Sequence, residues 1–168
     1  FIPFNYNIFT MAKTDIFINL DKISFSYLNG EMVLDNLDLR LHEKERIGLV
    51  GPNGSGKTTL FRLIMGLLIP GSGKLEIFNQ KMACKKDFIT VRKKIGLLFQ
   101  KADDQLFSPT VIDDVAFGPL NQGKSISEAK AIAREVLISL GLDEFEERVT
   151  YRLSGGEKKL VSLATVLA

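Results

Sequence analysis

Apolar and polar residues alternate over residues 23–27 and again over residues 37–41. Side chains of a strand point to opposite faces in turn, so this period predicts two half-buried strands of an antiparallel sheet. Asn29 and Gly30 lie between the two segments and supply the residue types of a tight hairpin turn.

A short apolar run, RIGLV at 46–50, predicts a buried strand of a parallel sheet, because such strands are covered on both faces. Four apolar residues then follow at helical spacing: Leu60, Phe61, Ile64 and Leu67. They predict a helix over 57–67, which the turn residues PGSG at 70–73 close. Further apolar runs at 75–78 and 95–99 predict two more strands.

The second half of the chain has helical periodicity. Thr110 is a suitable N-cap for a helix that runs to about Phe117, and Ser127 for a second helix that ends at Gly141. Ser154 and Glu157 form the S-x-x-E pattern that opens a third helix. One face of that helix is predicted to be apolar: Leu160, Val161, Ala164 and Leu167.

The composition is that of one globular domain: 168 residues, 45% of them hydrophobic. A net charge of +2, from 22 basic and 20 acidic residues, gives no electrostatic argument for a nucleic-acid partner. The single cysteine, Cys84, cannot form an internal disulfide. Residues 1–10 carry no positive segment typical of a signal peptide, and we interpret them as a non-native or upstream leader before Met11.

Residues 51–59 read GPNGSGKTT and match the phosphate-binding pattern G-x-x-x-x-G-K-[ST]. Glycines let a backbone wrap closely around an anion, and the following helix adds its positive N-terminal end. Lys57 is placed to reach the β- and γ-phosphates, and the Thr58 hydroxyl to ligate Mg²⁺. The sequence predicts a nucleotide site formed by Gly51, Pro52, Asn53, Gly54, Ser55, Gly56, Lys57, Thr58 and Thr59.

A second motif, LSGGE, spans Leu153, Ser154, Gly155, Gly156 and Glu157. In one interpretation it is only a capped helix start with a loosened first turn. The two glycines, however, each disfavour a helix by about 1 kcal/mol, which favours a position that another group approaches closely. Its N–H groups then offer a second anion site.

Together these motifs resemble the ATP-binding subunits of ABC transporters, over about residues 16–168. The fold implied is α/β: a P-loop core with an antiparallel flank, a helical subdomain at about 101–153 and the C-terminal part of the sheet missing. Residues 11–168 then form the N-terminal part of one such domain. The resemblance assigns Tyr27 to stacking on adenine, and Gln100 to linking Mg²⁺ and the attacking water to a membrane partner.

By the same resemblance, two copies pair, as a homo- or heterodimer, and LSGGE of one covers the ATP held by Lys57 of the other. The protein is then an ATPase that lies peripherally on the cytoplasmic face of the cell membrane and drives an integral-membrane subunit. The segment 103–123 is similar to the cobalt, nickel and energy-coupling-factor importers, although many members carry an arginine where Leu160 stands. The cargo implied by this resemblance is cobalt or nickel ions. Vitamin uptake through an energy-coupling factor is the alternative, and a truncated, non-functional ABC fragment is another.

The family's Mg²⁺-binding Asp, its general base Glu and its later His should all follow Ala168, so the chain is predicted to be inactive and poorly soluble alone. His42 precedes the phosphate loop and is interpreted as a surface residue. The pairs at 103–104, 113–114 and 146–147 are interpreted as solvated carboxylates. DNA-repair and translation-factor ABC proteins are competing classes, but the first needs a long coiled coil and the second two cassettes on one chain.

Overall fold

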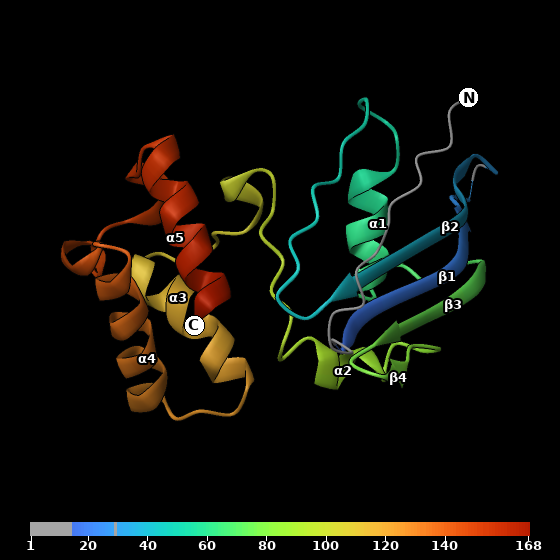
Figure 1. Ribbon diagram of the computed structural model, residues 1–168. Helices are drawn as coiled ribbons and strands as arrows, with labels where there is room; N and C mark the ends of the chain where they lie inside the picture. The colour runs from blue at the N-terminus through green and yellow to red at the C-terminus, as the bar shows by residue number, and fades with distance from the viewer. Residues whose placement is uncertain (1–14, 29) are drawn as a thin grey trace. The chain divides into compact units, whose positions relative to one another are not determined.

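The computed structural model describes residues 15–28 and 30–168. The chain divides into two compact units, of which the first ends at Arg92 and the second comprises Lys93–Ala168 (Figure 1). The expected leader at 1–10 lies outside the described residues, as does Asn29 of the expected hairpin turn. A helical subdomain bounded at about 101–153 stays a prediction.

The first unit is built on one antiparallel sheet in the order β2-β1-β3-β4. Its strands are β1 (Ile16–Ser26), β2 (Met32–His42), β3 (Ser72–Ile77) and β4 (Gln80–Lys81). The two alternating segments are thus confirmed as paired strands, and Gly30 has the positive φ of a turn residue, 80°. The strand expected at 75–78 starts earlier, at Ser72, and ends before Phe78, whose φ is 49°.

A bulge in β1 explains why its apolar period is not strict. Leu20 and Ile23 are both buried although they are three residues apart. Between them the pairing with β2 shifts register, and Lys22 has a φ of 51°. The N–H group of Lys22 donates to the Asp38 carboxylate at 2.8 Å, so the interrupted ladder still satisfies this donor.

The helix after the phosphate loop, α1 (Lys57–Ile64), ends three residues before the predicted position. Gly66 stops it, because its φ is 64° and a Cβ there would come within 2.2 Å of the Phe88 ring. Phe88 opens the short helix α2 (Phe88–Val91). The guanidinium of Arg92 then donates to the carbonyls of Met65 and Gly66 at 2.9 and 3.0 Å.

The parallel strand predicted at 46–50 and the further strand predicted at 95–99 are both wrong. Neither segment belongs to a strand, and Val50 is 96% exposed. A strand forms only against a neighbour that takes up its backbone hydrogen bonds. The single sheet of the described residues pairs neither segment, so apolar runs that would suit a buried strand stay extended and partly exposed.

The second unit packs three helices around one core: α3 (Val111–Asn121), α4 (Ile126–Ser139) and α5 (Gly155–Leu167). Short 3-10 helices connect them: η1 (Ala102–Asp104), η2 (Asp143–Phe145) and η3 (Thr150–Arg152). The core is aliphatic and includes fully buried small residues, which let the helices approach closely. Its members include Val111, Val115, Ala129, Ala133, Leu137, Val161 and Ala164.

The three helices were predicted from local sequence patterns with three errors. Thr110 caps α3 and accepts from the Asp113 N–H group, as predicted, although α3 continues to Asn121. The cap of α4 is Ser125, not Ser127, because only Ser125 stands three residues before Glu128 and forms a capping box with it. On α5, Leu160 and Leu167 are largely exposed, unlike the buried Val161 and Ala164.

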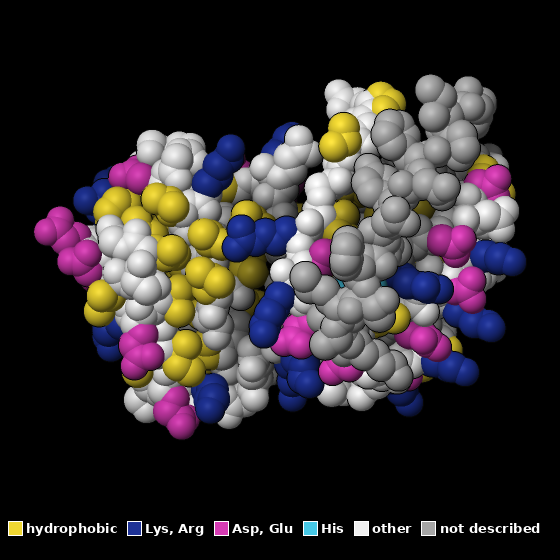
Figure 2. Space-filling model, in the orientation of Figure 1, with side chains coloured by type: hydrophobic (Ala, Val, Ile, Leu, Met, Phe, Trp, Pro, Cys, Tyr) yellow, Lys and Arg dark blue, Asp and Glu magenta, His cyan; other side chains and the backbone are white. Residues whose placement is uncertain are grey.

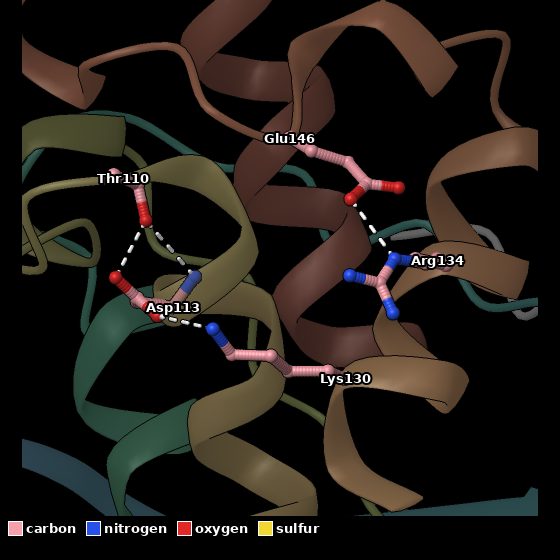
Figure 3. Close-up of polar contacts among 5 residues, drawn as sticks. All are labelled: Thr110, Asp113, Lys130, Arg134 and Glu146. Carbon is pink, nitrogen blue, oxygen red and sulfur yellow. Dashed lines mark hydrogen bonds and ion pairs between the residues drawn. The ribbon is translucent and has the colours of Figure 1, made fainter. Parts of the chain in front are cut away.

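Polar contacts join α3, α4 and the segment that precedes the LSGGE motif at 153–157, called the signature motif from here on (Figure 3). Lys130 on α4 pairs with Asp113 at 3.6 Å, and the Thr110 hydroxyl donates to the same carboxylate at 2.6 Å. Arg134, one turn further along α4, pairs with Glu146 at 2.9 Å. Because these groups are partly exposed, each pair contributes only about 0 to 1 kcal/mol. They orient the helices more than they stabilise them.

Candidate functional site

The phosphate loop owes its shape to two glycines. Gly54 and Gly56 both have a φ of 84°, a conformation that residues with a Cβ rarely adopt. Gly56 also packs closely on β2: a Cβ there would lie 3.0 Å from Val33 Cγ1 and 2.9 Å from Leu34 Cδ2. The loop is therefore held against the edge of the sheet at the residue where α1 starts.

The ammonium group of Lys57 lies over the loop. It donates to the carbonyls of Gly51 and Pro52 at 2.8 and 2.6 Å, and to the Ser55 hydroxyl at 3.3 Å. An ammonium has three protons, so these acceptors use all of them. A phosphate oxygen can be bound by exchanging one of these bonds, which keeps the charge close to the loop while the anion enters.

The N-terminus of α1 has the features of an anion site. Its N-cap is Gly56, which offers no side-chain cap, and its first turn has no acidic residue. The first N–H groups of a helix have no partner within it, so these donors and the helix dipole face the loop. The Thr58 side chain is exposed and Thr59 is buried. The residues present therefore fit a polyphosphate with Mg²⁺ on Thr58.

Tyr27 lies directly after β1 and contacts this loop region. Its hydroxyl lies 3.1 Å from Thr59 Oγ1, and its ring meets Phe25 edge-on, with the centroids 5.0 Å apart. Tyr27 is 37% exposed, so part of its surface is accessible. The structure thus brings Tyr27 and the phosphate loop together in the first unit.

The second motif starts α5 with a complete capping box. The Ser154 side chain accepts from the Glu157 N–H group, and the Ser154 N–H group donates to the Glu157 carboxylate at 2.7 Å. That backbone bond is the main reason why the pKa of Glu157 lies below its usual value, with the Ser154 side chain and Arg148 adding to it. The Arg148 guanidinium is 3.2 Å from the same carboxylate.

The two glycines of the motif have open space around them. A Cβ built on Gly155 or Gly156 meets no described atom outside α5 within 4 Å, and neither has a positive φ. Unlike Gly56, they serve no evident purpose in the folding of their own chain. The start of α5 therefore has room for a group from outside the unit to come close.

Gln100 is exposed and lies in the second unit, in the same unit as the signature motif. Its neighbourhood depends on a residue that the sequence did not single out. Gln105 accepts from the Phe99 N–H group at 3.1 Å and donates to Ser162 O and Thr165 Oγ1 on α5. The partners are 57 and 60 residues away, so no local pattern could have revealed them.

Asp114 corrects the interpretation of the acidic pairs as solvated surface. It is 2% exposed, and its Oδ1 accepts from the N–H groups of Phe107 and Ser108 at 3.1 and 2.9 Å. Thr150, also buried, donates to the Ser108 carbonyl at 2.7 Å. These bonds fix the chain turn before α3 and tie it to the segment that leads into the signature motif.

Within residues 15–28 and 30–168, no cluster of three His, Cys, Asp or Glu side chains is arranged to hold a metal ion. The same part of the chain contains no helix with the length and apolar character needed to cross a membrane.

A family model described as "ABC transporter" matches residues 34–168. The chain is 52% identical over 151 residues to an ABC transporter ATP-binding protein of Brucella suis. The aligned region covers 90% of this chain and 62% of the relative. It is 43% identical over 152 residues to the energy-coupling factor transporter ATP-binding protein EcfA of Methanothermobacter thermautotrophicus. That alignment covers 90% of this chain and 49% of EcfA.

Among solved structures, cbiO1 of Clostridium perfringens, described as part of the ABC transporter complex cbiONQ, superposes with a TM-score of 0.80. The two share 32% identity, over 91% of this chain and 61% of the other. The chain thus spans between about half and three-fifths of these relatives. The likeness confirms the predicted α/β fold class with its antiparallel flank and helical part.

Proposed function

Because this chain belongs to the ABC transporter family, in which the ATP-binding subunits hydrolyse ATP, we propose that it is the ATP-binding, energy-coupling subunit of an importer. One observation carries the proposal: the Lys57 ammonium lies over a loop shaped by Gly54 and Gly56, at a helix start that no side chain caps. This is a site for a multiply charged phosphate.

The residues of the first unit divide the binding of Mg²⁺-ATP among them. Lys57 and the first N–H groups of α1 hold the β- and γ-phosphates, and the exposed Thr58 hydroxyl ligates Mg²⁺. Tyr27, which contacts Thr59 and Phe25, is proposed to stack on the adenine. The bound Mg²⁺ supplies positive charge that stabilises the transferring phosphoryl group. Gln100 is proposed to contact this ion and the attacking water.

Pairing of two copies is the second element of the proposal. The open space at Gly155 and Gly156, together with the N–H groups at the start of α5, suits close approach to a nucleotide held by another copy. ATP then joins the copies, and hydrolysis releases them.

An integral-membrane subunit is the proposed partner. Apolar side chains gather over α4 and α5 on the face of the helical unit that Figure 2 shows. Elsewhere in this unit, Phe107 and Phe117 are 67% and 44% exposed and meet edge-on at 4.8 Å. An exposed aromatic pair is typical of a protein interface, and this one follows Gln100 in the sequence. The protein is therefore proposed to lie peripherally on the cytoplasmic side of the membrane.

The cargo is proposed to be cobalt or nickel ions, on the resemblance of segment 103–123 to the group of cobalt, nickel and energy-coupling-factor importers. The name of the relative EcfA favours the alternative, vitamin uptake through an energy-coupling factor. Uptake of labelled metal and of labelled vitamin, in cells with and without the gene, separates the two. The expectation that residues 1–168 alone do not turn ATP over stays a prediction.

The proposal is tested by ATP hydrolysis with the complete protein and its Lys57→Ala variant. Loss of one phosphate-binding cation is expected to lower turnover at least about 100-fold and to weaken ATP binding. Lys85→Ala, which removes an exposed lysine of the same unit, is the matched control and should change neither. Equal turnover by wild type and Lys57→Ala would remove the basis of the proposal.

A further inference from the structure

The side chain of Gln105 connects two segments that are distant in sequence. Its Oε1 accepts from the Phe99 N–H group at 3.1 Å. Its Nε2 donates to the Ser162 carbonyl at 2.8 Å and to the Thr165 hydroxyl at 2.7 Å. Three of the four hydrogen bonds that an amide side chain can make are thus formed, by a residue that is only half-buried.

These bonds belong to a longer contact between segment 96–105 and α5, the helix that starts at the signature motif. Gly96 packs on Val166, where a Cβ would come within 2.1 Å of the valine methyl. At the other end of the segment, Asp103 pairs with Lys158 at 2.5 Å. The partners on α5 follow one another at helical spacing, so the segment lies along one side of the helix (Figure 1).

The backbone next to Gln100 has little other support. Residues 95–99 form no strand with any described part of the chain, so no sheet ladder holds them. The bond from Phe99 to Gln105 restrains the peptide just before Gln100. This hydrogen bond therefore fixes the position of the Gln100 backbone relative to α5.

The residue type fits this task. Only an amide both accepts from a backbone N–H group and donates to two oxygens. A glutamate would face Ser162 O and Thr165 Oγ1 without a proton to donate, and a lysine could not accept from Phe99. A residue that only filled space here could be aliphatic.

We propose that Gln105 is a positioning residue that fixes Gln100 relative to the signature helix, so that the two move as one body. The inference rests on the proposed function, in which Gln100 meets Mg²⁺ and water while the start of α5 covers the nucleotide of the partner copy. A change at either place is then passed to the other through the amide of Gln105.

The first test is Gln105→Leu in the complete protein, assayed with its partner subunits. Turnover is expected to fall about tenfold to 100-fold, because a catalytic contact is displaced, while the KM for ATP stays within about twofold. The nucleotide is bound by the other unit, so binding should be spared. Gln122→Leu, at an exposed glutamine after α3, is the control and should match wild type.

Hydrogen exchange gives a readout that does not depend on activity. The Phe99 amide should exchange faster in Gln105→Leu, whereas amides within α3 should be unchanged. Thr165→Val removes one acceptor and should cause a smaller change of the same kind, and Thr165→Ser, which keeps the hydroxyl, should restore wild-type behaviour. If Gln105→Leu does not fold, the two Thr165 variants test the same hydrogen-bond network.

A double-mutant cycle separates positioning from general support. If Gln105 acts through Gln100, then Gln105→Leu should lower turnover no further in a Gln100→Ala background. Additive losses would overturn the inference, as would unchanged turnover in Gln105→Leu when wild type hydrolyses ATP. A wild-type protein without ATP hydrolysis would instead overturn the proposed function and this inference with it.

Discussion

Two helices of this chain, α1 and α5, start at glycine-rich motifs, but their N-termini are capped differently. α1 starts at Gly56, has no side-chain cap and has no acid in its first turn. α5 starts at Ser154, has a full capping box and carries Glu157 in its first turn. The first end is left positive beside Lys57, whereas the second is largely neutralised within its own unit.

The comparison shows that similar motifs need not make similar sites. The sequence suggested an anion site at each end, because both combine glycine with free N–H groups. Glu157 is ionised at neutral pH, since its pKa is lowered by the Ser154 N–H group first and by Arg148 among other groups. An anion therefore finds a complete site at α1, but at α5 only a surface that can complete a site formed elsewhere.

The largest expected effect is that of Gly56→Ala. A Cβ at a φ of 84° costs about 1 to 2 kcal/mol, and contact with Val33 and Leu34 adds about 1 to 3 kcal/mol. Urea unfolding should show a loss of about 2 to 5 kcal/mol, and ATP binding should be lost with it.

Gly54→Ala is the matched control for this change. It has the same φ, but a Cβ there meets no described atom within 4 Å, so only the first cost applies. Equal losses in the two variants would mean that contact with β2 does not shape the loop.

Gly156→Ala should have the opposite effect on stability. The position is helical and open, so alanine should raise the free energy of unfolding by up to about 1 kcal/mol. Turnover by the complete protein should nevertheless fall at least about tenfold, since the new methyl obstructs approach of the partner's nucleotide. A more stable protein with undiminished turnover would refute the assignment of α5 to that contact.

The smallest expected effect is on the loss of stability at acidic pH. Because the folded pKa of Glu157 is lowered from 4.5, its contribution to stability is present above the unfolded pKa. That contribution is lost as the pH falls through the folded pKa. Glu157→Gln should therefore flatten the decline in unfolding free energy between about pH 5 and pH 3.

Glu128→Gln provides the comparison for this measurement. Glu128 closes the capping box of α4, and its pKa is lowered by the Ser125 side chain first and then by the Ser125 N–H group. Each carboxylate has a cation nearby, Lys124 for Glu128 and Arg148 for Glu157, but of the two only Glu157 forms an ion pair, at 3.2 Å. The Glu157 variant should therefore lose the larger part of its effect in high salt. Identical salt responses would show that Arg148 adds nothing.

Features that depend on neighbours in the sequence were predictable. The spacing of Ser154 and Glu157 gave the cap of α5, and the same spacing from Ser125 to Glu128 could have corrected the choice of Ser127. Gly51 to Thr58 gave the phosphate loop, because each residue type there serves a local backbone need. Their roles in nucleotide binding stay predictions.

Features that depend on distant partners were not predictable. The runs at 46–50 and 95–99 have the composition of strands, but composition does not show whether a neighbouring strand is there to pair. In the sequence, Asp114 could not be told from its partly exposed neighbour Asp113. The N–H groups that donate to Asp114 belong to Phe107 and Ser108, in a loop that folds back onto α3. Gln105 looked like an ordinary loop amide for the same reason.

Arg92 has a mechanical consequence for the phosphate helix. It holds the carbonyls of Met65 and Gly66 just beyond the last turn of α1, and it is the final residue of the first unit. A helix is stiff along its axis, so a phosphate that pulls on the N–H groups at one end loads the guanidinium at the other. If the first unit binds a nucleotide as proposed, that load would act about a helix length away, at the peptide where the chain passes into its second unit.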